Sequence, residues 1–235
     1  MQTMRTLVAS AAALLMSATA FGQLKQSDIE KLNEATGVLG ELRNTAEGGI
    51  PDSLFSKAHC VVVIPDLKKA GFILGGEHGS GVMSCRRGNT WSPPVFMDLT
   101  KGSAGLQIGV QSTDLVLLVM NQSGADKLLR NKVTLGGDAS VAAGPVGRAA
   151  SAGTDAQLSA EMLSYSRAHG VFAGLDLSGG VLRPDNKASA AFYGHDVSDR
   201  DVLSGSEQPV TPSSARSLMA ALNSGLSHKP SKHGA

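Results

Sequence analysis

Apolar residues recur at steps of three and four between residues 24 and 46, which is the spacing of one face of an α-helix. This stripe consists of Ile29, Leu32, Ala35, Leu39 and Leu42. Ser27 and Glu30 form the pattern of a capping box at its start. Gly37 and Gly40 weaken an isolated helix by about 1 kcal/mol each relative to alanine. The helix therefore needs a surface to lie on, either the folded domain or a membrane.

Short strands are predicted from Cys60 onward. Residues 60–64 and 114–120 are continuous apolar runs, typical of strands that are covered on both faces. Apolar residues alternate with small or polar ones over 105–111, 133–143 and 171–177, which is the two-residue period of a strand. Turn-forming pairs separate these runs, at Pro65-Asp66, Gly75-Gly76, Gly88-Asn89, Pro93-Pro94, Gly144-Pro145 and Gly179-Gly180.

Short helices are predicted between and after the strands, over 51–58, 123–130, 186–194 and 213–226. The chain holds 28 glycines, well above average usage. Many of them fall inside strand patterns, at Gly71, Gly102, Gly105, Gly109, Gly136, Gly137 and Gly174. Glycine there marks bulges, corners or close backbone approach. We therefore predict an α+β fold, mostly antiparallel, with a glycine-rich curved sheet or barrel-like core, an N-terminal helix and short peripheral helices.

The first twenty residues have the pattern of a secretory signal peptide. Arg5 supplies a positive charge, residues 7–16 are apolar, and Ala18-Thr19-Ala20 fits a cleavage site, with Ala20-Phe21-Gly22 as a second option. A buried N-terminal helix is the alternative explanation. The prediction is a signal peptide over 1–20, a domain over 21–200 and a Ser- and Pro-rich tail over 201–235. The mature protein is then secreted or periplasmic, or peripheral on a membrane.

Charge and composition argue against nucleic acid as a partner. The chain has 21 Lys and Arg against 20 Asp and Glu, and loss of Arg5 leaves a balance of 20 against 20. A neutral chain has no global field that would steer it onto nucleic acid. Aromatic residues, at 4%, also offer few platforms on which bases could stack.

Recognisable catalytic motifs are missing from the sequence. It has no Walker A, H-E-x-x-H or G-x-S-x-G pattern and no cysteine–histidine cluster with zinc spacing. Glu77-His78, and His195 with Asp196 and Asp199, are the best acid–base candidates, but such groups are more often solvated turns. We therefore expect a protein that is not an enzyme and that holds neither a cofactor nor a metal.

Two cysteines, Cys60 and Cys85, follow the predicted cleavage site. An oxidising compartment permits a disulfide between them, which would close a loop of about 25 residues and contribute roughly 3–4 kcal/mol. Two buried thiols on separate strands are the alternative, because a bridge requires Cα atoms within about 7 Å. The spacing alone leaves both open.

Basic residues at turns are the best candidates for binding. They are Lys68, Lys69, Arg86, Arg87, Lys101 and Arg148. Cations at loop ends beside exposed backbone N–H groups suit phosphate or anionic headgroups. Turn charge that serves only solubility is the alternative.

Five ordered strings resemble the SYLF domain family, and together they extend over nearly the whole predicted domain. They are KAGFILGGEHGSGV (69–82), WSPPVF (91–96), GLQIGVQSTDLVLLV (105–119), LGGDASVAAGPVGR (135–148) and YSRAHGVFAGLDLSGGVLRPD (165–185). SYLF domains are lipid-binding modules of yeast and animal actin-patch proteins and of exported bacterial proteins. The chain is identified as an exported bacterial member.

The resemblance implies binding of anionic membrane lipid, phosphoinositides in eukaryotic members, through basic surface residues and an N-terminal amphipathic helix, here 24–46. The chain departs from the family at His169, Val171 and Ser178, where relatives often have lysine, leucine and glutamate. The missing lysine weakens a headgroup site at that turn. Actin is an unlikely partner for an exported bacterial protein. The alternative function is a structural or protein-interaction module of the cell envelope.

Overall fold

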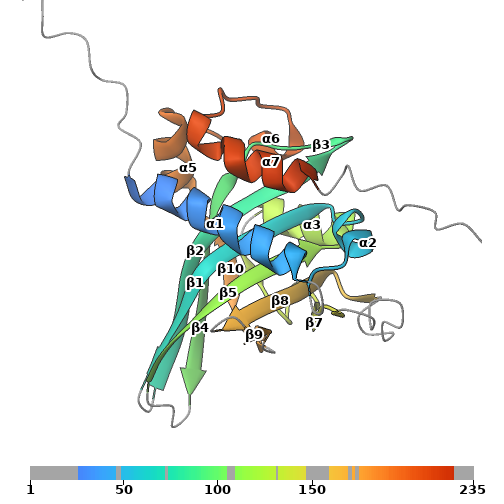
Figure 1. Cartoon of the computed structure of the whole chain (residues 1–235). Helices are drawn as coiled ribbons and strands as arrows, with labels where there is room; N and C mark the ends of the chain where they lie inside the picture. Colours follow the sequence, from blue (N-terminus) through green and yellow to red (C-terminus); the bar gives the residue numbers. More distant parts are fainter. Residues whose placement is uncertain are drawn as a thin grey trace, which may run out of the picture.

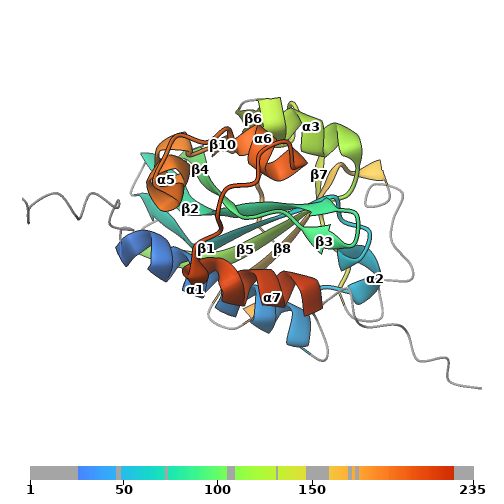
Figure 2. The ribbon, with the colours of Figure 1, turned by 90° about the horizontal axis from the view of Figure 1, so that it is seen from above.

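The computed structural model describes residues 26–45, 49–71, 74–104, 109–130, 132–146, 159–168, 171–172 and 175–224. A curled sheet forms the middle of the molecule, and helices cover both of its faces (Figures 1 and 2). The helices are α1 (Gln26–Asn44), α2 (Asp52–Phe55), α3 (Gln122–Arg130), α5 (Asn186–Tyr193), α6 (Asp199–Ser204) and α7 (Arg216–Ser224), with a 3-10 turn, η2 (Ser213–Ala215). Helices α1 and α7 lie on one face, and α3, α5 and α6 lie on the other (Figure 2).

The sheet follows the order β6-β10-β4-β2-β1-β5-β8-β7, while β3 pairs with β2 and β9 with β8. Its strands are β1 (Cys60–Gly71), β2 (Leu74–Arg87), β3 (Thr90–Trp91), β4 (Val95–Ala104), β5 (Gly109–Val119), β6 (Val133–Thr134), β7 (Val141–Ala143), β8 (Met162–Ala168), β9 (Val171–Phe172) and β10 (Val181–Pro184). Only the β7–β8 pair of this sheet, among the described strands, is parallel. The predicted α+β, mostly antiparallel fold is confirmed. The sheet is a half-barrel, because its end strands β6 and β7 do not pair with each other in the described strand order.

Helix α1 rests on the domain through its predicted apolar stripe. Leu32, Ala35, Leu39 and Leu42 are fully buried in the core. The helix packs against β1, β2, β5 and α7, and lies along one side of the sheet (Figure 1). It begins at Gln26, so Ser27 lies in its first turn rather than at its cap. Of the two surfaces that the sequence left open, the structure selects the domain, and the apolar stripe is not available to a membrane.

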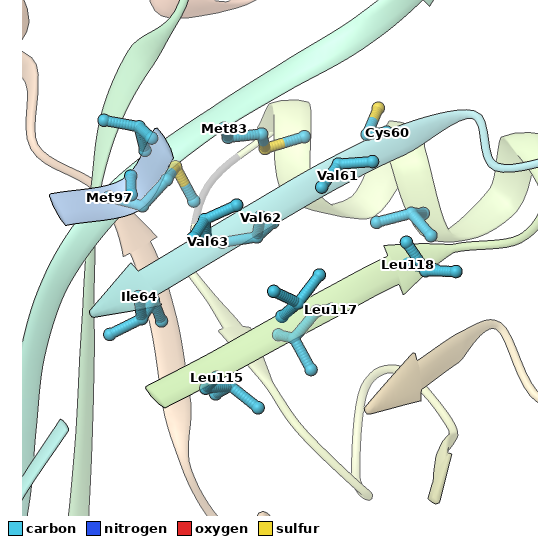
Figure 3. Close-up of a cluster of buried hydrophobic side chains, with 14 of the residues drawn as sticks. Cys60, Val61, Val62, Val63, Ile64, Met83, Met97, Leu115, Leu117 and Leu118 are labelled. Atoms are coloured by element: carbon cyan, nitrogen blue, oxygen red, sulfur yellow. The ribbon is translucent and has the colours of Figure 1, made fainter. Parts of the chain in front are cut away.

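The two continuous apolar runs form the centre of the core. Residues 60–64 of β1 and 115–119 of β5 are buried throughout, as predicted for strands covered on both faces. Figure 3 shows them side by side, and Met83 of β2 and Met97 of β4 belong to the same buried cluster. The layers of helix on either side explain why neither face of these strands carries polar residues.

The predicted turn at Pro65-Asp66 is a bulge inside β1 instead. Pairing with both β2 and β5 shifts register between Val63 and Lys68, and Asp66 adopts a φ of 54°. The backbone N–H of Asp66 donates to a carboxylate oxygen of Asp114 at 3.2 Å. Pairing with both neighbouring strands resumes after the bulge, so the strand continues in the same direction, which is why the turn prediction was wrong here. Gly75-Gly76, another predicted turn, lies within β2 for the same reason.

Residues beyond 200 belong to the packed structure rather than to a tail as far as Ser224. Val202 and Leu203 of α6 and Leu218 and Leu222 of α7 are buried in the same core as the strands. Helix α6 was not predicted, and Gly205 is its left-handed C-cap. The other short helices, α2, α3, α5 and α7, are confirmed. Residues 1–20 lie outside the described residues.

Cys60 and Cys85 face each other across β1 and β2. They are register partners with a Cα–Cα distance of 4.0 Å, and their sulfurs are joined as a disulfide. Both side chains are buried. The bond ties the two central strands together at the end nearest to α2.

Candidate anion-binding site

The predicted basic residues lie at opposite ends of the long strands. Lys68 pairs with His78 near one end of β1, while Arg86 follows Cys85 at the other. The strand between them spans roughly 25–30 Å. Lys101, which pairs with Glu77, joins Lys68 and Lys69 at the far end, where β1, β2, β4 and β5 project beyond the helices (Figure 1). The six residues therefore do not form one patch, and Arg148 lies outside the described residues.

Acidic residues neutralise the three cations at the far end. Lys68 pairs with Asp66 at 3.1 Å, Lys69 with Glu77 at 3.3 Å, and Lys101 with Asp176 at 3.3 Å. Glu77 is buried, with its side chain only 3% exposed, so it is no solvated turn residue as the sequence suggested. Three positive and three negative charges leave this end without a net positive field. The lipid-binding role of these lysines stays a prediction.

Arg86 and Arg87 are held by the protein itself. Arg86 donates hydrogen bonds to the carbonyl oxygens of Ala58 and Phe55, both at 3.0 Å, and lies over the Trp91 ring. Burial lowers the pKa of its guanidinium. Arg87 donates to the carbonyl oxygen of Gly205 at 3.4 Å. These contacts give both arginines a structural role.

Four other cations line a pocket of about 690 Å³ on the face of the sheet opposite α1. We call this cavity the basic pocket. It lies where the end of α3, strand β10 and the starts of α5 and α6 meet, and its cations are Arg130, Lys132, Arg183 and Arg200. A volume of this size is typical of pockets that hold small organic ligands.

Local structure sets the position of each cation. Arg130 is the last residue of α3, whose Ala125 and Leu128 are buried against the domain. Arg183 is exposed because its neighbour Leu182 points into the core from β10. Arg200 lies in the first turn of α6, where the Ser198 hydroxyl accepts a hydrogen bond from the N–H of Asp201 and so begins the helix.

The basic pocket carries more positive than negative charge. Arg183 is 3.6 Å from Asp98, whereas Arg130, Lys132 and Arg200 form no ion pair within the part of the chain that the structure describes. Asp196 and Asp199 also line the pocket. Burial raises the pKa of Asp199 to about 6, and the charge of Asp185 adds to that shift, while the nearby Ser189 hydroxyl opposes it. An anion of more than one charge would meet free cations here.

This site was not predicted from the sequence. Its four cations lie on α3, β10 and α6 and in the segment before β6, and not at the turns between strands where cations were expected to bind. Two signals were visible. Arg130 and Lys132 stand together at the end of a predicted helix, and Arg183 lies within a string that carried the family resemblance.

The acid–base candidates near residue 195 do not form a catalytic group. His195 is exposed and lies 3.9 Å from Glu207, while Asp199 is buried in the α6 start. Among the residues that the structure describes, no group of three or more His, Cys, Asp and Glu could hold a metal. No helix in the same part of the chain is long and apolar enough to cross a bilayer.

Comparison with known proteins places the chain in a family. A family model described as Ysc84, Las17-binding protein actin regulator, matches residues 100–225, which is more than half of the chain. An SH3 domain-containing protein of Schizosaccharomyces pombe is 38% identical over 183 residues, covering 76% of this chain and 42% of the relative. LAS seventeen-binding protein 3 of Saccharomyces cerevisiae is 33% identical over 194 residues, covering 80% of this chain and 42% of the relative.

An animal relative gives a similar picture. SH3 domain-containing YSC84-like protein 1 of Rattus norvegicus is 30% identical over 184 residues, covering 77% of this chain and 53% of the relative. The chain thus spans about half, or less, of the length of the curated relatives it matches. Because the family model matches more than half of its length, the chain belongs to the Ysc84/SYLF domain family.

Proposed function

We propose that this protein binds anionic phospholipid reversibly at a membrane surface, without catalysing a reaction, and that the headgroup enters the basic pocket. Lipid binding is what the SYLF resemblance implies. The observation that carries the proposal for this chain is that Arg130, Lys132 and Arg200 face one pocket and form no ion pair among the described residues. The cations predicted from the sequence, where their side chains are described, are already held by acidic groups, carbonyl oxygens or an aromatic ring.

The strength of binding follows from the number of cations. Each Lys or Arg close to an anionic surface contributes about 1 kcal/mol. Four of them give a moderate affinity, which salt weakens because exposed charges are screened beyond about 8 Å at physiological ionic strength. Binding of this kind is reversible and depends on the anionic fraction of the membrane.

Sedimentation with vesicles tests the proposal. Vesicles of phosphatidylcholine with phosphatidylglycerol should carry the protein down at low salt, while high salt or pure phosphatidylcholine should release it. A variant with Arg130→Gln, Lys132→Gln and Arg200→Gln should lose about 3 kcal/mol of binding. Absent or salt-independent binding to the acidic vesicles would remove the proposal.

A matched variant separates the basic pocket from cations elsewhere on the surface. Lys31→Gln, Lys57→Gln and Lys68→Gln together remove the same charge from other parts of the surface. We expect this control to bind vesicles almost as the wild type does. If it loses binding while the pocket variant keeps it, cations outside the basic pocket carry the function instead.

We also propose that the protein is exported. The support is the signal-peptide pattern of residues 1–20 and the disulfide between Cys60 and Cys85, a bond that forms and persists in oxidising compartments. Mass spectrometry of protein recovered from the producing cells should show a chain that begins at Phe21. Recovery of the uncleaved chain with free thiols from the cytoplasm would contradict export.

A further inference from the structure

Asp199 is a buried carboxylate in the wall of the basic pocket. It follows the N-cap Ser198 as the first residue of α6, and only 6% of its surface is exposed. Among the described residues, none donates a hydrogen bond of normal geometry to either carboxylate oxygen, although the Ser189 hydroxyl lies near enough to oppose the rise of its pKa. A buried and unpartnered charge is costly, so this residue is poised between its ionised and neutral forms.

We propose that Asp199 makes anion binding by the basic pocket proton-dependent, so that the pocket holds an anionic headgroup more tightly when Asp199 is neutral. This inference rests on the proposed function and adds its regulation. Ionised Asp199 offsets one of the pocket cations and repels an entering anion. Protonation removes that charge without moving any pocket cation away.

The groups around Asp199 favour this behaviour. From α5 and its cap it is faced by Asp185, Ser189 and Tyr193, and Asp185 repels a second negative charge. Further charged groups that line the pocket or lie on the elements packed around it include Arg130, Lys132, Arg183 with Asp98, Lys187, Asp196, His195 with Glu207, Arg200, Asp201 and Arg87. Burial and Asp185 together raise the pKa of Asp199 to about 6, within the range that a change of compartment reaches.

Thermodynamic linkage gives the same inference a second consequence. If a proton on Asp199 strengthens anion binding, a bound anion must strengthen proton binding by the same factor. Binding near pH 6 to 7 is therefore expected to draw a proton from the buffer. Calorimetry in two buffers of different ionisation enthalpy measures that proton directly.

The test compares full-length mature protein with Asp199→Asn at about pH 5 and pH 7.5. The probe is a phosphatidylcholine vesicle with phosphatidylglycerol, whose phosphodiester keeps its charge over this range. A unit charge about 4 Å from the bound anion is worth about 1 kcal/mol at the dielectric of water, which is about fivefold in affinity, and more where the pocket excludes water. On acidification, the affinity of the wild type should rise by at least that factor relative to the affinity of Asp199→Asn. At pH 7.5 the variant should bind as tightly as the protonated wild type.

Two further variants isolate the effect. Asp196→Asn removes an exposed carboxylate from the same pocket, and should tighten binding at both pH values without changing the pH dependence. His195→Gln removes the histidine that precedes Asp196 in the sequence. If His195→Gln abolishes the response to acid and Asp199→Asn keeps it, the inference is overturned.

Failure of the inference differs from failure of the proposed function. Equal pH dependence in wild type and Asp199→Asn, or no proton uptake on binding, would overturn the role of Asp199 while vesicle binding stands. No binding at either pH, in any of these proteins, would remove the proposed function itself. A circular dichroism spectrum of each variant confirms that loss of binding does not come from unfolding.

Discussion

The guanidinium carbon of Arg86 lies 4.3 Å from the centroid of the Trp91 ring, on the strand that pairs with its own. The same side chain donates to the carbonyl oxygens of Phe55 and Ala58, which lie in and just after α2. Arg86 thus joins the α2 segment to the β2–β3 hairpin. A residue that the sequence suggested for lipid binding is a packing residue instead.

Replacing Arg86 by methionine should destabilise the fold. The variant loses a cation–π contact and leaves two carbonyl oxygens without their charged donor, which together costs about 2–4 kcal/mol of unfolding free energy. Urea denaturation measures this loss. Lys68→Met, which removes an exposed ion pair, should cost less than about 1 kcal/mol. Vesicle binding by folded Arg86→Met should match the wild type, and a selective loss of binding would contradict the structural role.

Asp199 should make stability fall as the pH rises. Its folded pKa of about 6 lies above the ordinary value of 3.8, so the folded state binds more protons between those values. The stability that protonated Asp199 contributes is fully present below about pH 4. It is lost as the pH rises through 6, and the total loss is about 2–3 kcal/mol of unfolding free energy. Asp199→Asn should therefore gain that much relative to the wild type between pH 4 and 7.5 in urea titrations. If the unfolding free energy of the two proteins depends on pH in the same way, this prediction is wrong.

Gly81 is a position where any side chain must disturb the sheet. A Cβ there would overlap the Val63 carbonyl and come within 2.8 Å of the Ile64 Cα, beside the bulge of β1. Gly81→Ala should cost about 3 kcal/mol or more, because the two central strands must separate. Gly102→Ala is the matched control, since nothing lies within 4 Å of its Cβ. It should leave stability unchanged or raise it by about 0.5–1 kcal/mol.

The disulfide should contribute to stability without contributing to binding. Cys60→Ala with Cys85→Ala frees a loop that the bond closes over a sequence separation of 25 residues. On the chain-entropy model the loss is about 3–4 kcal/mol. Reductant should lower the melting temperature of the wild type by about as much as the double substitution does. It should not change the melting temperature of the variant. A wild-type melt that does not respond to reductant would show that the thiols are free in solution.

Parts of the fold could be predicted because local spacing determines them. The stripe of α1 and the apolar runs of β1 and β5 follow from side-chain periodicity alone. Helix α6 escaped prediction because six residues hold little periodic signal. The bulge at Asp66 escaped because pairing with β2 and β5, which resumes beyond that dipeptide, carries the strand on where the local pattern predicts a turn.

By itself the sequence determined the class of fold, the family and the residues that fill the core, since each depends on patterns along the chain. Only the tertiary structure decided which cations stand together. Arg130, Arg183 and Arg200 meet because the sheet order places β10 beside β4 and packs α3, α5 and α6 over that edge. A charge pattern in one dimension does not contain that order, because strand pairing is a property of the whole folded chain.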